Sequence, residues 1–212
     1  MDKFRDRWEA GIVLAKSLKD YANLANVIIL ALPRGGLPVA YEIAQALSAP
    51  LDIFIVRKLG VPEHAELAMG AIASHETVIF NTQLLNELKI EQASIDAVLE
   101  LEQKELWRRE RLYRGDRPFP KLEGKTIVLV DDGIATGATM QAAVVSLRKH
   151  NPASIIIAVP VAARETCGEM TKLVDRMICP LQPLNFYAVG LWYENFTQIS
   201  DLEVIEILEK QT

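Results

Sequence analysis

The segment Ile127-Val-Leu-Val-Asp-Asp-Gly-Ile-Ala-Thr-Gly-Ala-Thr139 is the most informative part of this chain. Its apolar residues predict a buried β-strand over 126–130, and this strand ends in two adjacent carboxylates, Asp131 and Asp132. A turn of small residues follows, and a helix-forming run begins near Met140. Backbone N–H groups in such a turn can approach an anion closely, and the helix start adds a favourable dipole. The segment therefore predicts a phosphate-binding loop between a strand and a helix.

The small and hydroxyl residues of this turn are the candidate phosphate ligands. They are Gly133, Ala135, Thr136, Gly137, Ala138 and Thr139. The two carboxylates suit sugar hydroxyls or a magnesium shell. The alternative is an ordinary strand-to-helix turn of a doubly wound fold, but paired acids at a strand end are costly without a ligand or cation. We therefore favour a ligand site.

Composition limits the class of protein. The chain has 212 residues, of which 50% are apolar and 24% charged, as expected for one globular domain with a sizeable core. The net charge of −5 argues against a generally basic nucleic-acid-binding surface. Cys167 and Cys179 have no metal-ligand companions and are interpreted as reduced thiols. The charged first residues do not resemble a signal peptide, and no apolar run approaches the ~20 residues of a membrane span. We therefore expect a cytoplasmic protein that binds neither nucleic acid nor membrane.

Apolar strands alternate with helices along the chain, which predicts an α/β fold with a mostly parallel central sheet flanked by helices. A first amphipathic helix includes Phe4, Trp8 and Ile12. Strands are expected at 27–32, 51–56, 126–130, 155–161 and 174–178, a hairpin at 68–73 and 77–80, and helices at 37–47, 91–113, 139–150 and 164–173.

Three predicted strands end in glycine or polar residues. The first ends in Pro33-Arg34-Gly35-Gly36, the second in Arg57-Lys58, and the central one in Asp131-Asp132. Because ligands bind at the carboxyl ends of parallel strands, we expect one composite site there. A guanidinium beside free N–H groups suits a pyrophosphate. The alternatives are a plain helix-initiating turn at Gly35 and a solvated strand end at Arg57.

The segment from Ile127 to Thr139 resembles the motif by which type I phosphoribosyltransferases bind phosphoribosyl pyrophosphate (PRPP). Pro33-Arg-Gly-Gly36 is similar to the pyrophosphate loop of that family, where a non-proline cis peptide is common, so unusual backbone is expected over 32–35. The chain most resembles a bacterial group of predicted phosphoribosyltransferases with no assigned base. The resemblance implies transfer of a 5-phosphoribosyl group between PRPP and a nitrogenous base, with Mg²⁺ as cofactor and release of pyrophosphate.

The resemblance also implies roles for individual residues. Asp131, Asp132 and Arg34 would be catalytic, and the two carboxylates would hold the metal through water or ribose hydroxyls, with Glu194 as a further metal candidate. The implied substrate-binding set is Gly35, Gly36, Arg57, Lys58, Gly133, Ala135, Thr136, Gly137, Ala138, Thr139, Tyr113, Arg114, Trp192 and Tyr193.

A single domain over residues 1–212 would carry two additions. A lid at about 74–120 would bring Tyr113 and Arg114 over PRPP, and a hood from about 1–20 and 180–212 would stack the base on Trp192 and Tyr193. The basic stripe Lys104, Arg108 and Arg111 on the predicted helix can also be read as an ordinary solvated face. A homodimer is one candidate assembly.

Oxopurine enzymes of this family carry an aspartate just before the Thr-Gly pair, where this chain has Ala135. This argues against hypoxanthine or guanine as the acceptor by that route. Two functional classes stay open, an enzyme and a non-catalytic regulator that binds PRPP or a nucleotide. A dehydrogenase is a distant third, because the dinucleotide-binding glycine fingerprint is missing.

Overall fold

A parallel sheet of five strands forms the centre of the computed structural model, which describes residues 3–75 and 77–211. The strand order is β2-β1-β6-β7-β8, and every pairing within it is parallel. This confirms the predicted fold class. The strands are β1 (Val27–Ala31), β2 (Leu51–Ile53), β6 (Thr126–Val130), β7 (Ser154–Ala158) and β8 (Arg176–Ile178).

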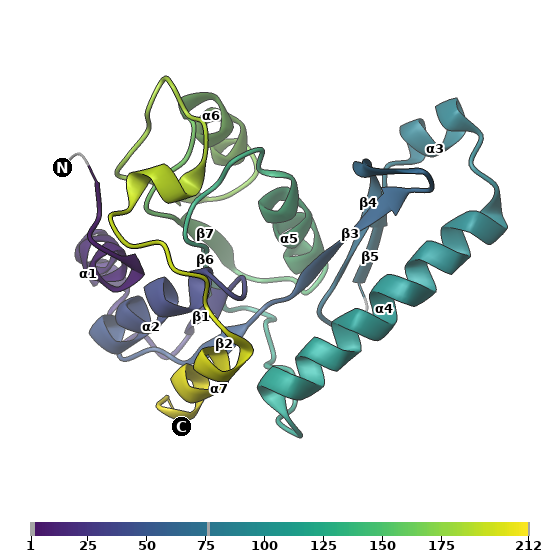
Figure 1. Cartoon of the computed structure of the whole chain (residues 1–212). Coiled ribbons are helices and arrows are strands. Elements are labelled where there is room, and N and C mark those ends of the chain that lie inside the picture. Colours follow the sequence, from purple (N-terminus) through teal and green to yellow (C-terminus); the bar gives the residue numbers. More distant parts are fainter. Residues whose placement is uncertain (1–2, 76, 212) are drawn as a thin grey trace.

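Helices cover both faces of this sheet (Figure 1). The middle strands β1 and β6 are buried along their whole length, which is why their sequences are almost continuously apolar. One core lies between the sheet and the helices on one face, and the second core lies on the other face. The helices of the first face include α1 (Arg7–Ser17) and α2 (Gly36–Leu47), and those of the second are α5 (Ala138–Arg148) and α6 (Arg164–Thr171).

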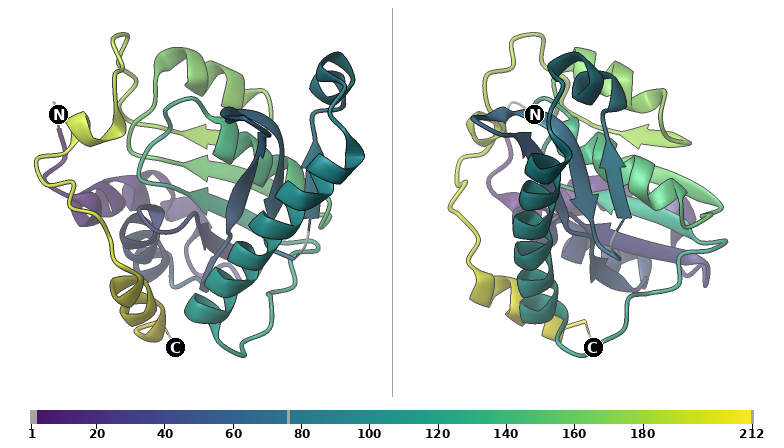
Figure 2. Two further views of the ribbon diagram at one scale, coloured as in Figure 1. Left: turned by 45° about the vertical axis from the view of Figure 1, so that its right-hand side comes forward. Right: turned by 90° about the vertical axis from the view of Figure 1, so that its right-hand side faces the viewer.

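A second sheet projects from the first as an arm (Figures 1 and 2). Its strands pair antiparallel in the order β3-β4-β5, so the hairpin predicted from 68–73 and 77–80 is confirmed, with a third strand added. A long helix packs along the arm and contacts β3. The arm comprises β3 (Val56–Val61), β4 (His64–Ala73), β5 (Thr77–Phe80), α3 (Thr82–Leu88) and α4 (Gln92–Arg114).

The predicted strand over 51–56 is wrong in its extent. The parallel strand ends at Ile53, and a separate strand begins at Val56 and runs into the arm. Arg57 and Lys58 therefore lie inside β3, paired with Ile72 and Ala71, and do not stand at a carboxyl end of the parallel sheet. The sequence contains no glycine or proline between 51 and 56 that would mark this change of sheet.

The first described residues meet the segment around Tyr193 on one side of the molecule. Phe4 forms a parallel bridge with Tyr193, and Phe4 N–H donates to the Trp192 carbonyl at 2.9 Å. The short 3-10 helices η1 (Lys19–Tyr21) and η2 (Val189–Trp192) and the helix α7 (Asp201–Glu209) complete the fold. Sequence analysis missed α7, although Ser200 and Glu203 form a capping box at its start.

Within the described residues, no helix combines the length and apolar character needed to cross a bilayer.

Candidate active site

The loop between β6 and α5 forms a small cavity. Ile134 N–H donates to the Val161 carbonyl at 2.9 Å, which ties the loop to the segment after β7. Thr166, on α6, donates its hydroxyl to the Ala135 carbonyl at 3.0 Å. The cavity has a volume of about 130 Å³ and is lined by Asp131, Gly133, Ile134, Ala135, Thr136, Gly137, Ala138, Thr139 and Met140. All six predicted phosphate ligands thus lie around one hollow.

The start of α5 supplies hydrogen-bond donors to this cavity. Gly137 caps α5 with φ of +81°, a conformation that favours glycine, and its missing Cβ leaves room for the Thr166 methyl group. Thr136 and Thr139 are exposed. The first N–H groups of a helix have no acceptor within that helix, so the start of α5 offers donors and a positive dipole end. The loop can therefore hold a phosphate group.

A second loop, after β1, lies against the carboxylates. The Pro33–Arg34 peptide bond is cis, as expected for this segment. Leu32 N–H donates to the Val130 carbonyl at 2.8 Å, so the ends of β1 and β6 stay together. A Cβ on Gly35 would lie 2.0 Å from Asp132 Oδ2, and only glycine permits this approach. The structure therefore brings two of the three predicted strand ends into one site.

Asp131 and Asp132 occupy the centre between the two loops. Burial raises the pKa of Asp131 well above its usual value, and the neighbouring charge of Asp132 raises it further. Burial also raises the pKa of Asp132, although the Arg7 guanidinium opposes this effect. Asp131 Oδ1 accepts the Asp132 backbone N–H at 2.8 Å. Two carboxylates held this way have a strong tendency to gain a cation or hydroxyl donors.

Arg7 is a site residue that sequence analysis missed. Its Nε donates to Asp132 Oδ2 at 2.7 Å, and its Nη1 donates to the Thr197 carbonyl at 2.8 Å. The guanidinium lies 3.8 Å from the centre of the Phe196 ring, and the Arg7 side chain is only 8% exposed. Arg7 is the first residue of α1, far from the loop in sequence, and no local pattern marks it as a partner of Asp132.

Arg34 is partly exposed and close to α7. Its Nη1 lies 3.8 Å from Asp201 Oδ1, and the Tyr113 hydroxyl donates to the same carboxylate. Burial raises the pKa of Tyr113 to about 12, with a further contribution from Asp201. Tyr113 and Arg34 therefore share Asp201 as a partner. The hydroxyl proton of buried Tyr113 is donated to Asp201 and is not available to a ligand in this conformation.

Arg114 does not reach the site. It is buried, with Nη2 donating to the Ile53 carbonyl at 2.9 Å, and it also contacts Asp52 and Glu110. Because a buried guanidinium needs these partners, Arg114 anchors the end of α4 to β2. This placement argues against the predicted contact between Arg114 and PRPP.

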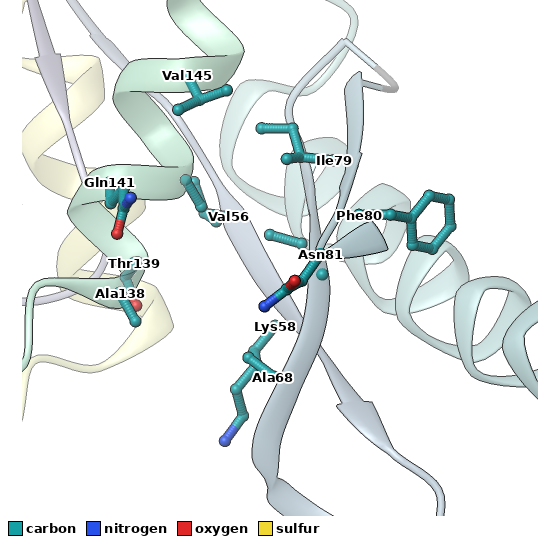
Figure 3. Close-up of a pocket in the computed structure, with 13 residues that line it drawn as sticks. Val56, Lys58, Ala68, Ile79, Phe80, Asn81, Ala138, Thr139, Gln141 and Val145 are labelled. Carbon is teal, nitrogen blue, oxygen red and sulfur yellow. The ribbon is translucent and has the colours of Figure 1, made fainter. Parts of the chain in front are cut away.

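Arg57 and Lys58 have different surroundings. Arg57 pairs with Glu102 of α4 at 2.6 Å, so its guanidinium joins β3 to α4 within the arm. Lys58 lines a second cavity, of about 310 Å³, that also includes Ala138 and Thr139 of the phosphate loop. Figure 3 shows this cavity between α5 and the arm, with the Lys58 side chain directed away from Val145. Lys58 therefore stays a candidate for contacting a ligand at the loop, and Arg57 is committed to Glu102.

The hood residues are mostly engaged in packing. Tyr193 is buried, and its hydroxyl donates to the Asp132 carbonyl at 2.6 Å, so it supports the loop and cannot stack a base in this conformation. Trp192 is partly buried, and its Nε1 has no hydrogen-bond partner in the described structure. The Glu194 backbone N–H donates to the Phe4 carbonyl at 2.8 Å, while the residue is exposed.

The carboxylate pair fits one particular mode of metal binding. Across residues 3–75 and 77–211, no three His, Cys, Asp or Glu side chains gather as a metal site, so Glu194 does not join the two carboxylates in one cluster. Mg²⁺ is commonly held by one or two carboxylates, waters and substrate phosphates. Asp131 and Asp132 fit that mode and do not fit an all-protein cage.

The chain is similar to known proteins in sequence and in fold. The family model "Phosphoribosyl transferase domain" matches residues 8–193. "Putative phosphoribosyl transferase Rv0571c" of Mycobacterium tuberculosis is 42% identical over 210 residues, which cover 99% of this chain and 47% of that protein. The chain thus spans about half the length of the curated relatives it matches.

Solved structures agree on the fold. The crystal structure of TT1426 from Thermus thermophilus is 34% identical, covers 99% of both chains and superposes with a TM-score of 0.87. AQ2163 from Aquifex aeolicus is 16% identical over 84% of this chain and 76% of its own, with a TM-score of 0.50, and indicates the fold alone.

Proposed function

Because this chain belongs to the phosphoribosyl transferase domain family, of type I fold, we propose that it binds PRPP with Mg²⁺ and transfers the 5-phosphoribosyl group to a nitrogenous base, or catalyses the reverse reaction. Pyrophosphate is the other product. The observation that carries the proposal is the contact between two loops at the carboxylate pair, where Gly35 approaches Asp132 and the phosphate cavity begins at Asp131.

The phosphate cavity suits the 5′-phosphate of the sugar. A phosphate group needs several donors around a compact anion, and N–H groups at the start of α5 with the hydroxyls of Thr136 and Thr139 can supply them. The neighbouring Asp131 would then accept hydrogen bonds from ribose hydroxyls. Burial raises the pKa of Asp131, and hydroxyl donors or a cation bound there would lower this pKa again by favouring the charged form.

The second loop suits the pyrophosphate. Arg34 is partly exposed, and its link to Asp201 is long enough at 3.8 Å to be exchanged for a diphosphate. Gly35 carries no side chain that would cover its backbone N–H, whereas the Gly36 N–H already donates to the Leu32 carbonyl at 3.1 Å. Gly35 is therefore the better backbone donor for the pyrophosphate. Bound Mg²⁺ would neutralise charge on the departing pyrophosphate, and Asp131 and Asp132 would hold it in part through water or ribose hydroxyls.

Catalysis by this site would rest on positioning and charge stabilisation. The bond from C1 of the sugar to pyrophosphate breaks as a nitrogen of the base attacks, and the sugar is oxocarbenium-like between the two. The phosphate loop fixes one end of the sugar and Arg34 stabilises the leaving group at the other. Arg7 orients Asp132 and favours its charged form, so that Asp132 can accept hydrogen bonds from the ribose hydroxyls.

A second candidate function is a regulator that binds PRPP or a nucleotide without turnover. The observation that favours it is the occupation of Asp132 by Arg7, which leaves fewer lone pairs of this carboxylate for a metal or sugar.

Calorimetry with PRPP, with and without Mg²⁺, tests the binding proposal. A carboxylate placed in the loop by Ala138→Glu would repel the 5′-phosphate, so affinity should fall at least tenfold. Val145→Glu places the same charge on the same helix two turns farther from the loop and serves as the control. Absence of heat with wild-type protein, or equal binding by Ala138→Glu, would reject the site.

A pyrophosphate-release assay with PRPP and a panel of purine and pyrimidine bases then separates the two functions. Release with at least one base, lost in Ala138→Glu, supports the transferase. Tight PRPP binding with no release on any base supports the regulator.

A further inference from the structure

A basic pocket lies at the end of α4, well away from the phosphate loop. It has a volume of about 360 Å³ and is formed by the last turns of α4, the turn between β4 and β5 and the loop after α4. Its lining residues are His75, Trp107, Glu110, Arg111, Arg114, Gly115, Arg117 and Phe119. We refer to it as the Trp107 pocket.

The length of α5 separates the Trp107 pocket from the phosphate loop of the candidate active site. α5 begins at the phosphate loop and has 11 residues, which at 1.5 Å per residue span about 16 Å. His150, just beyond the end of α5, contacts the ring of His75 at a centroid distance of 5.4 Å. The pocket therefore lies near the opposite end of α5 from the loop and cannot be part of the same cavity.

Its charges favour an anion. Arg114 is already paired with Asp52 and Glu110, and among the lining residues that the structure describes Glu110 is the one acid. Arg111 is exposed, and within the described residues its side chain makes no hydrogen bond or ion pair. Arg117 is exposed, and its bonds to other described residues all go to carbonyl groups. Two guanidinium groups at the rim thus lack an anionic partner, and guanidinium binds phosphate well.

An aromatic surface lies beside these charges. The His75 ring stacks on the Phe119 ring, with 5.1 Å between the ring centroids and 13° between the ring planes. The central carbon of the Arg114 guanidinium also lies 5.1 Å from the Phe119 centroid. The indole of Trp107 has no such partner among the described residues, and the residue is 47% exposed. Trp107 and Arg111 are four residues apart on α4 and therefore lie on the same side of the helix.

We propose that the Trp107 pocket binds a nucleoside monophosphate, with its base against Trp107 and its phosphate between Arg111 and Arg117. A pocket of this volume is within the range of small-ligand sites. Aromatic faces stack any base, and each such contact contributes to affinity. The proposal is independent of catalysis, because no residue of the phosphate loop takes part.

The test uses the Ala138→Glu variant, whose added carboxylate is expected to close the active site to phosphate. Loss of ribose 5-phosphate binding in calorimetry verifies this closure first. Calorimetry and tryptophan fluorescence are recorded with AMP, GMP, UMP and inorganic phosphate. At least one nucleotide should bind and quench fluorescence, and the quenching should disappear in Trp107→Phe. Adding Arg111→Ala and Arg117→Ala should weaken binding at least tenfold.

Arg108→Ala is the matched control, because Arg108 is an exposed arginine of the same helix that pairs with Glu105 outside the pocket. If the paired substitution unfolds the protein, Arg111→Glu alone reverses one rim charge without removing an internal contact. Nucleotide binding that is lost in Ala138→Glu itself, or that survives Arg111→Glu unchanged, would overturn the proposal.

Discussion

Replacement of Arg7 by methionine should destabilise the protein strongly. The Arg7–Asp132 contact joins two side chains that are only 8% and 15% exposed, at 2.7 Å. Methionine keeps the length and the apolar stem of arginine but removes the charge and both donors. Asp132 would then be a buried carboxylate without its cation.

The size of the loss follows from this geometry. Removing one partner of a buried ion pair typically costs about 3–5 kcal/mol, because the remaining charge stays desolvated. Domains of this kind are stable by only about 5–15 kcal/mol, so the change should be easy to measure. Adding Asp132→Asn removes the unpaired charge, and the double variant should regain a large part of the loss.

Urea unfolding followed by circular dichroism measures these differences at pH 7. Arg5→Ala is the matched control, since Arg5 contacts Asp6 at 3.1 Å but is 65% exposed, and its variant should match wild type. The penalty of Arg7→Met should shrink at pH 5. Without Arg7 the pKa of Asp132 rises further, so the carboxyl can take up a proton and lose its charge.

The reasoning fails if Arg7→Met unfolds at the same urea concentration as Arg5→Ala. It also fails if the double variant is less stable than Arg7→Met, because that result would mean that Asp132 contributes without its partner.

Three further changes test other parts of the site. Gly35→Ala places a Cβ 2.0 Å from Asp132 Oδ2 and should weaken PRPP binding at least tenfold in calorimetry, whereas Gly168→Ala, which meets no atom within 4 Å, should not; equal affinities would contradict the close approach. Asp131→Asn should flatten the pH dependence of stability. The pKa of Asp131 is about 4 in the unfolded chain and higher in the folded protein, so the folded protein keeps the proton to a higher pH. Wild type therefore loses stability as pH rises through the raised pKa. An identical slope of unfolding free energy against pH in the variant would refute this. Ser200→Ala removes the cap of α7 and should cost about 1 kcal/mol in urea unfolding, and an unchanged midpoint would argue against a stabilising cap.

Local signals account for the parts of the fold and site that could be predicted. An apolar strand, two acids and a small-residue turn lie within thirteen residues, so the loop from Ile127 to Thr139 was predictable as one unit. The cis peptide before Arg34 was expected from the resemblance of its loop.

The parts that could not be predicted depend on contacts between distant segments. Arg7 meets Asp132 across 125 residues, and no pattern near Arg7 predicts that contact. The change from β2 to β3 lies in an unbroken apolar run, so Arg57 was expected at a strand end and is found inside the arm. Ser200 and Glu203 are the exception, because their capping pattern was readable and predicts the start of α7.

The docking of the terminal segments has a consequence for the order in which the protein matures. Tyr193, which holds the backbone of Asp132, follows it by 61 residues, and Thr197 completes the binding of Arg7. During translation the loop leaves the ribosome before either residue exists. The cavity at the β6–α5 loop therefore gains these two contacts only after the segment around Tyr193 and Thr197 has been made. Ligand affinity measured on a nascent or partly refolded chain would therefore report whether the segment from Tyr193 to Thr197 has docked against Asp132 and Arg7.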